Sequence, residues 1–512
     1  MFLNIKRIAA VNIAFIFLSF LAVSQKSFAQ NPIVTENLMP GNPSSEWDIS
    51  GAGDLTIQGF ATDLSVDNGT TVNFKINVTD AANFNVKIYR LGYYQGNGAR
   101  LITNLGNFAG TIQPSPITDP SSGLVDCGNW SVSVSWAVPA NAVPGIYLAK
   151  LTRNDNNGAS HIAFVVRDDN SNADILFQTS DATWQAYNVY GGNSLYVGST
   201  AYPGGHATKV SYNRPFLTRA GGGGSSSSED WLFHAEYPMI RWLERNGYNL
   251  NYATNIDIAR FPNIMQNHKV FLSVGHDEYW SKEQRDNITA ARNNGKHLAF
   301  FSGNEIYWKT RWENSIDGSN TPYRTLVCYK EGTMGENTCG TKCDPSPVWT
   351  GLWRDGCTPT YPANDGCNPE NSLSGQISWQ WGYAAIQVPA AYKNLRFWRN
   401  TSISSLSEGQ VATLAANTLG YEFDWEQPNG HYPAGRILMS STTAFGKNHK
   451  LSLYKHSSGA WVFGAGTVQW SWGLDAVHDG SSSAEDIRMQ QATVNLFADM
   501  TVQPGSLQPG LV

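Results

Sequence analysis

Residues 270–280 read VFLSVGHDEYW, a short apolar run that leads directly into a histidine, two acids and two aromatic residues. The run Val270–Val274 has the length and composition of a buried β-strand. Ser281 and Gln284 follow in the pattern of a capping box, which predicts a helix that ends at Gly295. Because a buried strand followed at once by a helix is the building unit of a parallel sheet, this stretch indicates an α/β domain.

Strands and helices alternate on both sides of this stretch. Short apolar runs predict further strands at residues 175–178, 250–253, 297–301 and 461–466. A helix is predicted over residues 231–246 despite Pro238, and a closing helix to Met500 is predicted behind a cap of Ser483 and Asp486. We therefore expect a doubly wound α/β domain over residues 173–502, flavodoxin-like or glutamine-amidotransferase-like in topology.

The chain before residue 170 has a different pattern. Runs of strand length with period-two alternation occur at residues 71–78, 86–89, 130–136 and 146–151, with turn residues between them and no helical stretch. This pattern predicts an immunoglobulin-like antiparallel β-sandwich over residues 30–170. The protein is therefore expected to be a multi-domain α+β chain, with the polar segment 167–172 as its internal boundary.

Most cysteines lie in one excursion from the α/β pattern, an insertion at about residues 320–375 that is rich in Gly, Pro, Asn and Thr. They are Cys328, Cys339, Cys343, Cys357 and Cys367, and only Cys127 lies elsewhere. In an exported protein this pattern predicts disulfide bonds, whose connectivity the sequence does not determine. The alternative is a zinc site formed by Cys339, Cys343, Cys357 and Cys367.

The chain begins in the manner of an exported protein. Lys6 and Arg7 precede a mostly apolar run over residues 8–23, and Ser27-Phe28-Ala29 is a pattern that signal peptidase accepts. We expect residues 1–29 to be a cleavable signal peptide that sends the protein to the periplasm or the extracellular space, with a membrane anchor as the alternative. No later segment approaches the roughly 18 consecutive apolar residues of a membrane span.

Composition narrows the range of partners. The net charge is −6 and the 35 Lys and Arg residues form no cluster, which argues against a nucleic-acid partner. A homo-oligomer remains open. The tract Gly221–Ser228, four glycines and then four serines, is expected to form a flexible loop without a core of its own.

The candidate site lies where two predicted strands end. His276, Asp277 and Glu278 follow the strand over 270–274, and Asn304 follows the strand over 297–301. Parallel strands deliver their carboxyl ends to one crevice, so we expect Asn304 to approach His276. The structural alternatives are that the two acids cap the following helix and that Asn304 only forms a turn.

Several familiar chemistries are excluded by missing motifs. The sequence contains no Gly-x-Ser-x-Gly elbow, no His-Glu-x-x-His helix, and no dinucleotide or Walker fingerprint. His276-x-Glu278 is superficially like a zinc deaminase motif, but no Pro-Cys-x-x-Cys follows it. Serine hydrolases, zinc peptidases and nucleotide-dependent enzymes are therefore not expected.

Four segments together resemble the large-subunit family of N,N-dimethylformamidase. They are GHDEYW at 275–280, TWQAYN at 183–188, FSGNE at 301–305 and GYEFD at 420–424, and the resemblance extends from about residue 47 to residue 500. It implies hydrolysis of a formamide C–N bond at a mononuclear ferric site held by two tyrosines and a glutamate. A histidine, an asparagine and a second glutamate surround the metal in that family.

The resemblance assigns roles to particular residues of this chain. Glu278 corresponds to the metal-binding glutamate, His276 and Asn304 to the flanking pair, and Glu422 to the second glutamate. The metal-binding tyrosines are expected to be Tyr187 and Tyr147. Phenolate and carboxylate are hard oxygen donors that suit a trivalent iron.

Both tyrosine assignments have alternatives. Tyr190 and Tyr196 lie near Tyr187 in the sequence and could replace it. Tyr147 follows Pro144-Gly145-Ile146 near the start of a predicted strand, which is also the pattern of a structural tyrosine corner in a β-sandwich.

The function expected from these observations is metal-dependent hydrolysis of a carbon–nitrogen bond in a small amide. His276 would move protons and Asn304 would orient the substrate. The alternative is a non-catalytic carbohydrate-binding or cell-surface protein that uses its 18 Trp and 22 Tyr residues as stacking platforms. Bound iron and rows of exposed tryptophans distinguish the two.

Overall fold

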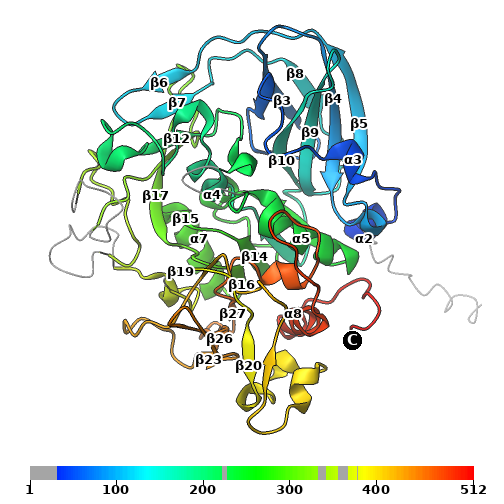
Figure 1. Ribbon diagram of the computed structural model, residues 1–512, viewed down its shortest axis with the longest axis vertical. Coiled ribbons are helices and arrows are strands. Elements are labelled where there is room, and N and C mark those ends of the chain that lie inside the picture. Colours follow the sequence, from blue (N-terminus) through cyan, green and yellow to red (C-terminus); the bar gives the residue numbers. More distant parts are fainter. Residues whose placement is uncertain (1–30, 222–227, 333–341, 356–366, 378) are drawn as a thin grey trace, which may run out of the picture.

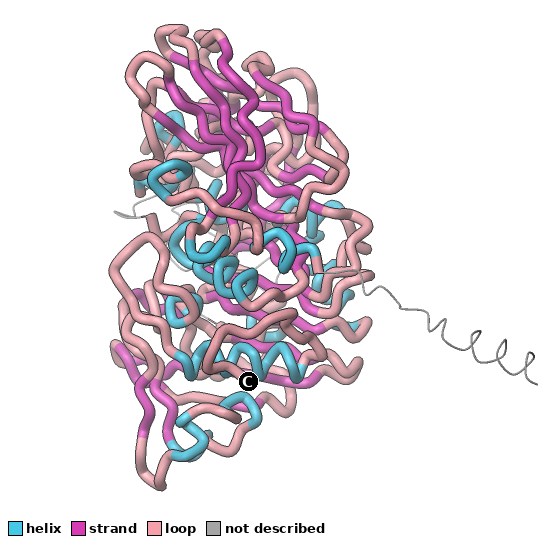
Figure 2. The backbone as a smooth tube through the Cα atoms, turned by 90° about the vertical axis from the view of Figure 1, so that its right-hand side faces the viewer, coloured by secondary structure: helices cyan, strands magenta, loops and turns pink. Residues whose placement is uncertain are grey.

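The computed structural model describes residues 31–221, 228–332, 342–355, 367–377 and 379–512. Its backbone forms a β-rich upper part and a mixed α/β lower part (Figures 1 and 2). The predicted signal peptide, most of the Gly221–Ser228 tract, Cys339 and Cys357 lie outside the described residues. Within those ranges, no helix is long and apolar enough to cross a membrane.

The upper part consists of two β-sheets with a shared core. The smaller sheet has the order β1-β3-β8 (Ile57–Ala61, Thr71–Val78, Val134–Ala137), and the larger has the order β2-β10-β9-β4-β5 (Ser65–Asp67, Ala159–Arg167, Gly145–Arg153, Phe84–Leu91, Ala99–Phe108). All neighbouring strands are antiparallel except β2 and β10, which run parallel. The short helices α2 (Pro32–Asn37) and α3 (Ser44–Trp47) and the hairpin β6–β7 (Ile117–Asp119, Leu124–Asp126) complete this part.

Alternating burial along the strands explains the facing sheets. In β3 every second side chain is buried, as the period-two pattern of residues 71–78 predicts. The strand predicted at 130–136 begins only at Val134. The reason is local, because the Ser131 amide donates to the side chain of Gln113 instead of to a neighbouring strand.

The lower part contains one large sheet of seven strands. Its order is β13-β11-β14-β16-β27-β26-β23 (Leu250–Ala253, Ile175–Gln178, Val270–Gly275, His297–Ser302, Trp461–Gly464, Ser452–Lys455, Ile437–Leu438). The first five are parallel, and β26 and β23 are antiparallel additions that the sequence pattern did not indicate. The chain enters at β11 inside the sheet and winds outward in both directions, which is the doubly wound arrangement.

Helices cover both faces of this sheet. On one face α5 (Leu232–Arg245) and α8 (Ile487–Asp499) share a core with Phe177, Leu272 and Phe301, and on the other α6 (Asn255–Arg260) and α7 (Lys282–Asn293) pack near Leu176, Phe271 and Phe300. Successive side chains of each strand are therefore buried against helices on opposite faces of the sheet. For this reason the strands are continuous apolar runs in the sequence. The helix α4 (Asp181–Ala186) follows β11 directly.

The predicted helix over 231–246 is confirmed, and Pro238 lies inside it. A proline has no N–H for the carbonyl four residues earlier, which here belongs to His234. The indole N–H of Trp472 donates to that carbonyl at 2.6 Å. A tertiary contact thus replaces the missing helical hydrogen bond.

Two predicted helix caps differ from the structure in part. Ser281 accepts from the Gln284 amide as expected, but the Gln284 side chain donates to Gln178 rather than back to the cap. The closing helix is capped by Asp486 alone, because the hydroxyl of Ser483 donates to the carbonyl of Trp472.

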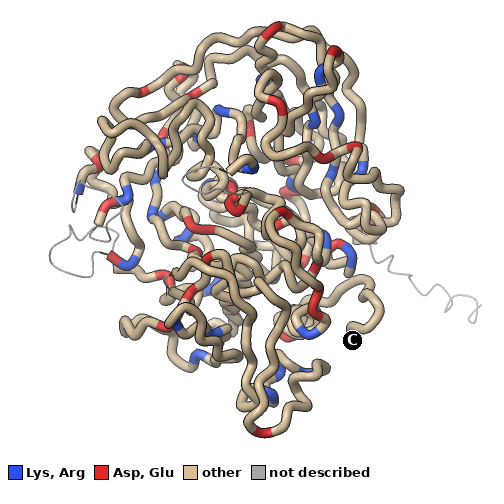
Figure 3. Tube along the Cα trace, viewed as in Figure 1, with Lys and Arg blue, Asp and Glu red and all other residues tan. Residues whose placement is uncertain are grey.

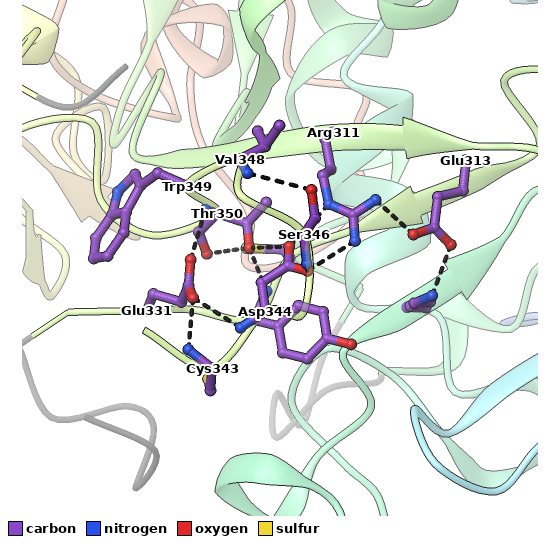
Figure 4. A network of polar contacts seen from close by, with 12 residues as sticks. Arg311, Glu313, Glu331, Cys343, Asp344, Ser346, Val348, Trp349 and Thr350 are labelled. Atoms are coloured by element: carbon purple, nitrogen blue, oxygen red, sulfur yellow. Dashed lines mark hydrogen bonds and ion pairs between the residues drawn. The ribbon is translucent and has the colours of Figure 1, made fainter. Parts of the chain in front are cut away.

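The Cys-rich insertion is organised by a buried glutamate (Figure 4). One oxygen of Glu331 accepts from the amides of Cys343 and Asp344 at 2.7 and 2.8 Å, and the other accepts from the Thr350 amide at 2.9 Å. Asp344 in turn forms an ion pair with Arg311. Cys343 and Cys367 each take part in a disulfide bond, whereas Cys127 and Cys328 are buried free thiols. Charge-assisted hydrogen bonds therefore order the described part of the insertion together with buried apolar side chains such as Trp349, Leu352 and Trp353.

Smaller strands surround the insertion and the far end of the sheet. A four-stranded sheet has the order β12-β18-β17-β15 (Lys209–Ser211, Thr325–Val327, Trp308–Glu313, Tyr279–Ser281). The two-stranded sheets are β19–β22 (Gln380–Trp381, Glu422–Phe423), β20–β21 (Gln387–Pro389, Val411–Thr413) and β24–β25 (Thr442–Ala444, Lys447–His449).

The two parts of the molecule are joined by a buried ion pair. Arg90 of β4 and Glu244 of α5 meet at 2.7 Å, with both side chains completely buried. The hydroxyl of Tyr252 donates to the same carboxylate. The outer face of the larger sandwich sheet contributes to the core around α5, so apolar packing and this ion pair fix the two parts against each other. Other charges of both signs are dispersed along the chain (Figure 3).

Candidate active site at the carboxyl edge of the large sheet

Strand β14 ends at a glycine that turns the chain into the site. Gly275 has a positive φ of 80°, and a Cβ atom there would lie 3.1 Å from the Cβ of Ala235. Glycine is the residue that adopts this conformation without strain. The turn places His276, Asp277 and Glu278 in the protein interior, each less than 5% exposed.

The imidazole of His276 is held from one side and faces carboxylates on the other. Its Nδ1 lies 2.8 Å from Asp230 and 2.6 Å from the hydroxyl of Tyr421. Its Nε2 lies 3.1 Å from Glu422 and 3.4 Å from Glu278. Burial disfavours the charged ring, but the carboxylates of Glu422 and Glu278 prevail and hold the pKa of His276 well above its usual value.

Two tyrosine hydroxyls converge on the carboxylate of Glu278. The hydroxyl of Tyr187 lies 3.1 Å from Oε2, and the hydroxyl of Tyr196 lies 3.1 Å from both oxygens. Their rings stack at 4.2 Å, and the hydroxyl of Tyr279 contacts that of Tyr196 at 2.6 Å. Burial, followed by the charge of Glu278, raises the pKa of Tyr187 well above its usual value.

Tyr147 does not belong to this cluster, and the expectation that it joins Tyr187 and Glu278 is wrong. Its ring packs inside the sandwich core against Trp136 and Phe164. Its hydroxyl donates to the carbonyl of Val143 at 2.7 Å, four residues upstream. This is the tyrosine-corner arrangement, so Tyr147 stabilises the sandwich, and Tyr196 takes its place in the candidate donor set.

Asn304 follows β16 and meets His276 through a shared carboxylate. Its backbone has a positive φ of 47°, and its amide donates to Asp424 at 3.0 Å. Its Nδ2 donates at 2.8 Å to Oε2 of Glu422, the oxygen that lies 3.1 Å from His276. Its buried Oδ1 has no hydrogen-bond partner among the described residues. The structure thus brings Glu422, Asn304 and His276 together, as the strand-end argument predicted for the last two.

Asp277 is turned away from the site. Its carboxylate accepts from Gln178 and Ser273 at 2.7 Å each and from Asn255 at 3.2 Å. Burial raises the pKa of Asp277 to about 6 despite these hydrogen bonds. Of the three consecutive polar residues, His276 and Glu278 face the candidate site. Asp277 instead accepts hydrogen bonds from residues of β11, β14 and α6.

Sequence reasoning missed three residues of the site. Asp230 follows the Gly/Ser tract, where the local pattern carried no functional signal, although it supports His276. Tyr421 precedes Glu422 in the GYEFD segment and was available there. Lys330 comes from the Cys-rich insertion, and its Nζ lies 3.2 Å from the ring centre of Tyr196 and 5.0 Å from that of Trp308.

The donor set differs in kind from a histidine or cysteine site. In the ranges that the structure describes, no group of three or more His, Cys, Asp or Glu side chains is arranged to hold a metal ion. The cluster around Glu278 instead offers two phenols and one carboxylate. Oxygen donors of this type suit hard cations.

Fold and cluster together place the protein among α/β proteins that carry their polar site at the carboxyl edge of a doubly wound sheet. A family model described as N,N-dimethylformamidase beta subunit-like, C-terminal, matches residues 85–485. The chain therefore belongs to this family.

Solved structures show only slight likeness. The AA10 lytic polysaccharide monooxygenase from Streptomyces lividans is 18% identical, with 20% of this chain and 58% of that chain covered and a TM-score of 0.14. A family 123 glycoside hydrolase from Clostridium perfringens is 10% identical, with 48% of each chain covered and a TM-score of 0.12. The chain spans less than two thirds of either structure. No curated protein matches the chain.

Proposed function

We propose that the protein is a metal-dependent hydrolase that cleaves the carbon–nitrogen bond of a small amide. The observation that carries the proposal is the convergence of Tyr187 and Tyr196 on the carboxylate of Glu278, at 3.1 Å each, beside His276. Membership of the dimethylformamidase-like family supports the same reaction class.

The residues present fit a mononuclear ferric ion. Tyr187, Tyr196 and Glu278 would hold it, because both phenol oxygens lie 3.1 Å from the Glu278 carboxylate and phenols lose their protons to a trivalent cation. When bound, such an ion polarises an amide carbonyl and lowers the pKa of water. Both phenols donate to Glu278, and burial together with the charge of Glu278 raises the pKa of Tyr187.

His276 is the proton carrier of the proposed reaction. Asp230 accepts from Nδ1 and thereby directs Nε2 toward the reacting groups. From there the imidazolium favoured by the neighbouring carboxylates can give a proton to the departing nitrogen, as amide cleavage requires, and the neutral ring can regain one from the water of the next turnover. Glu422, 3.1 Å from Nε2, stabilises the imidazolium before this transfer.

Asn304 orients the substrate. Its Nδ2 is engaged by Glu422, so the amide plane is fixed and Oδ1 is presented as an acceptor. An acceptor in this position can receive the N–H of an amide substrate. Its left-handed backbone conformation holds that side chain at the end of β16.

The proposal includes export. Residues 1–29 have the pattern of a signal peptide, although they lie outside the described residues. A small amide supplied from outside the cytoplasm is the corresponding substrate.

The test is iron content, visible spectrum and amide hydrolysis of the purified mature chain. We expect about one iron per chain, an absorption band from phenolate coordination, and release of amine from formamides. Glu278→Ala should lose iron and activity together, whereas His276→Ala should keep the iron and lose most turnover. A protein that binds no iron under any loading condition would contradict the metal assignment, and an iron-loaded protein inert toward all amides would contradict the reaction.

The carbohydrate-binding alternative finds little support. Among the described residues, Trp381 is the one tryptophan more than a third exposed, at 57%. A surface that binds glycan chains presents several exposed aromatic side chains in a row. The exposed tryptophan lies beside the candidate active site instead.

A further inference from the structure

Three aromatic residues alternate along the segment that borders the site. Residues 379–383 read WQWGY, and β19 occupies Gln380–Trp381. The pairing continues beyond the strand, because the Gly382 amide donates to the Tyr421 carbonyl and Ala384 bridges to Leu419. Trp379, Trp381 and Tyr383 are called the aromatic stripe here, and the rings of Trp381 and Tyr383 lie in contact across Gly382.

Trp381 lies on the face of the strand pair that carries Glu422. Trp381 is the direct antiparallel partner of Glu422. Directly opposite residues in an antiparallel pair project to the same side, with Cβ atoms about 5 Å apart. The side chain of Trp381 therefore leaves the backbone beside that of Glu422. The Glu422 carboxylate in turn contacts both His276 and Asn304.

Both ends of the stripe are anchored in the site. Trp379 packs against the cluster that contains Tyr187, and Tyr383 packs against Tyr421. The hydroxyl of Tyr383 donates to Glu229, the neighbour of Asp230. The ring centres of Trp381 and Tyr383 lie 6.0 Å apart in an edge-on arrangement.

Between these anchors, Trp381 remains 57% exposed. This exposed ring, in contact with Tyr383 and opposite Glu422, offers an apolar surface that a ligand of the site can cover. The two nearest polar side chains are engaged, since Gln380 donates to the Trp381 carbonyl and Glu229 accepts from Tyr383. A sugar ring needs in-plane hydrogen-bond partners beside a stacking face, whereas an aromatic ring needs the face alone.

We propose that Trp381 and Tyr383 bind the part of the substrate beyond the scissile amide, and that this part is an aromatic ring. The substrate class is thus amides that carry an aryl group, such as anilides. This inference rests on the proposed amide hydrolysis and extends it, because it makes Trp381 a determinant of specificity.

Phe445 provides a matched control. It is also 57% exposed, and it packs on the opposite face of the same segment, since a Cβ atom on Gly382 would lie 2.5 Å from its ring. Its ring lies beside Phe423, which has no role in the proposed reaction. The pair Trp381→Ala and Phe445→Ala therefore separates a specific ring contact from general surface hydrophobicity.

The experiment compares kcat/KM for formanilide and formamide in the wild type, Trp381→Ala, Trp381→Phe and Phe445→Ala. We expect the formanilide-to-formamide ratio to fall about tenfold in Trp381→Ala through a higher KM for formanilide, to recover partly in Trp381→Phe, and to stay unchanged in Phe445→Ala. An unchanged ratio in Trp381→Ala would overturn the inference. So would a stronger dependence on Trp381 for an N-acylated amino sugar than for formanilide.

A binding measurement keeps this inference separate from the proposed function. Calorimetric titration of acetanilide into His276→Ala, with and without Trp381→Ala, reports on the ring contact without any turnover. Loss of binding with Trp381→Ala supports the aryl site even if no amide is hydrolysed. Equal binding in both variants contradicts it even if hydrolysis is observed.

Discussion

Asp230 holds Nδ1 of His276 at 2.8 Å, and this contact determines that Nε2 is the nitrogen that faces Glu422 and Glu278. Asp230 lies 46 residues before its histidine, at the entry to α5. A carboxylate that fixes the orientation and tautomer of an imidazole is a recurrent arrangement in catalytic and metal sites.

Asp230→Asn should therefore lower kcat about 10- to 100-fold while KM and iron content change little. The amide side chain can still fit, but it no longer acts as an obligate acceptor for Nδ1–H. Steady-state kinetics with metal analysis test this. Asp479→Asn, which alters an acid paired with Arg219 away from the site, is the control. A loss of iron in Asp230→Asn would mean that Asp230 supports metal binding rather than proton transfer.

Substitution of Tyr196 should affect metal binding, whereas substitution of Tyr147 should affect only the stability of the sandwich. Tyr196→Phe removes a hydroxyl that lies 3.1 Å from both oxygens of Glu278, so iron affinity should drop at least tenfold and the visible band should weaken. Tyr147→Phe removes only the hydrogen bond to Val143, so iron should be retained and the free energy of unfolding should fall by about 1 kcal/mol. Iron loss in Tyr147→Phe would restore that residue to the donor set.

Lys330 should tune the spectrum of the loaded protein. Its Nζ lies 3.2 Å from the ring centre of Tyr196, where a positive charge stabilises the electron-rich ring. Lys330→Met should move the phenolate-to-iron absorption band to longer wavelength, and Lys330→Arg should leave it nearer the wild-type position. Absorption spectra at equal iron content decide this. A band that does not move in Lys330→Met shows that the ammonium has no electronic influence on Tyr196.

The ion pair between the two parts should matter far more than a surface pair. Glu244→Gln leaves Arg90 buried without its counter-charge, which should cost about 3–5 kcal/mol of unfolding free energy. Asp286→Asn removes the exposed pair with Lys282 and should cost at most about 1 kcal/mol. Urea unfolding with intrinsic fluorescence measures both. Equal costs would show that water reaches Arg90 in the folded protein.

Stability should fall as pH rises through the acidic range because of a buried acid pair beside Asn304. Burial raises the pKa of Glu305 to about 7, and burial together with the charge of Glu305 raises the pKa of Asp424 well above its usual value. The unfolded chain releases these protons near pH 4, so between about pH 4.5 and 7 the folded state binds more protons. The stabilising contribution is complete below that window and is lost above it.

Glu305→Gln should flatten this dependence. The difference in urea midpoint between pH 5 and pH 8 should be smaller in Glu305→Gln than in the wild type, and Asp286→Asn should match the wild type. Identical slopes in Glu305→Gln and the wild type would show that Glu305 is ionised across the whole range.

Much of the fold could be predicted from local pattern. The alternation of residues 71–78 predicts β3, the apolar run at 250–253 predicts β13, and the Gly247 stop predicts the end of α5. These features follow from backbone geometry. Apolar residues recur every two positions in a strand and about every 3.6 positions in a helix, so a short stretch of sequence reveals them. The convergence of His276 and Asn304 was predictable for a related reason, since parallel strands end at one edge.

Other features depend on contacts that no local pattern records. Glu278 faces the site and Asp277 does not, because Gln178 and Asn255 on other elements donate hydrogen bonds to the Asp277 carboxylate. The sequence left Tyr147 open between a metal-binding and a tyrosine-corner role and Tyr196 open as a replacement for Tyr187, and packing places the first in the sandwich core and the second at Glu278. Asp230 reaches His276 only because α5 docks beside β14. The sequence by itself thus determined the five parallel strands, the helices α5, α7 and α8 and the edge at which the site forms. Which side chains meet there was decided by tertiary packing, because those contacts join residues far apart in the chain whose relative positions depend on the whole core.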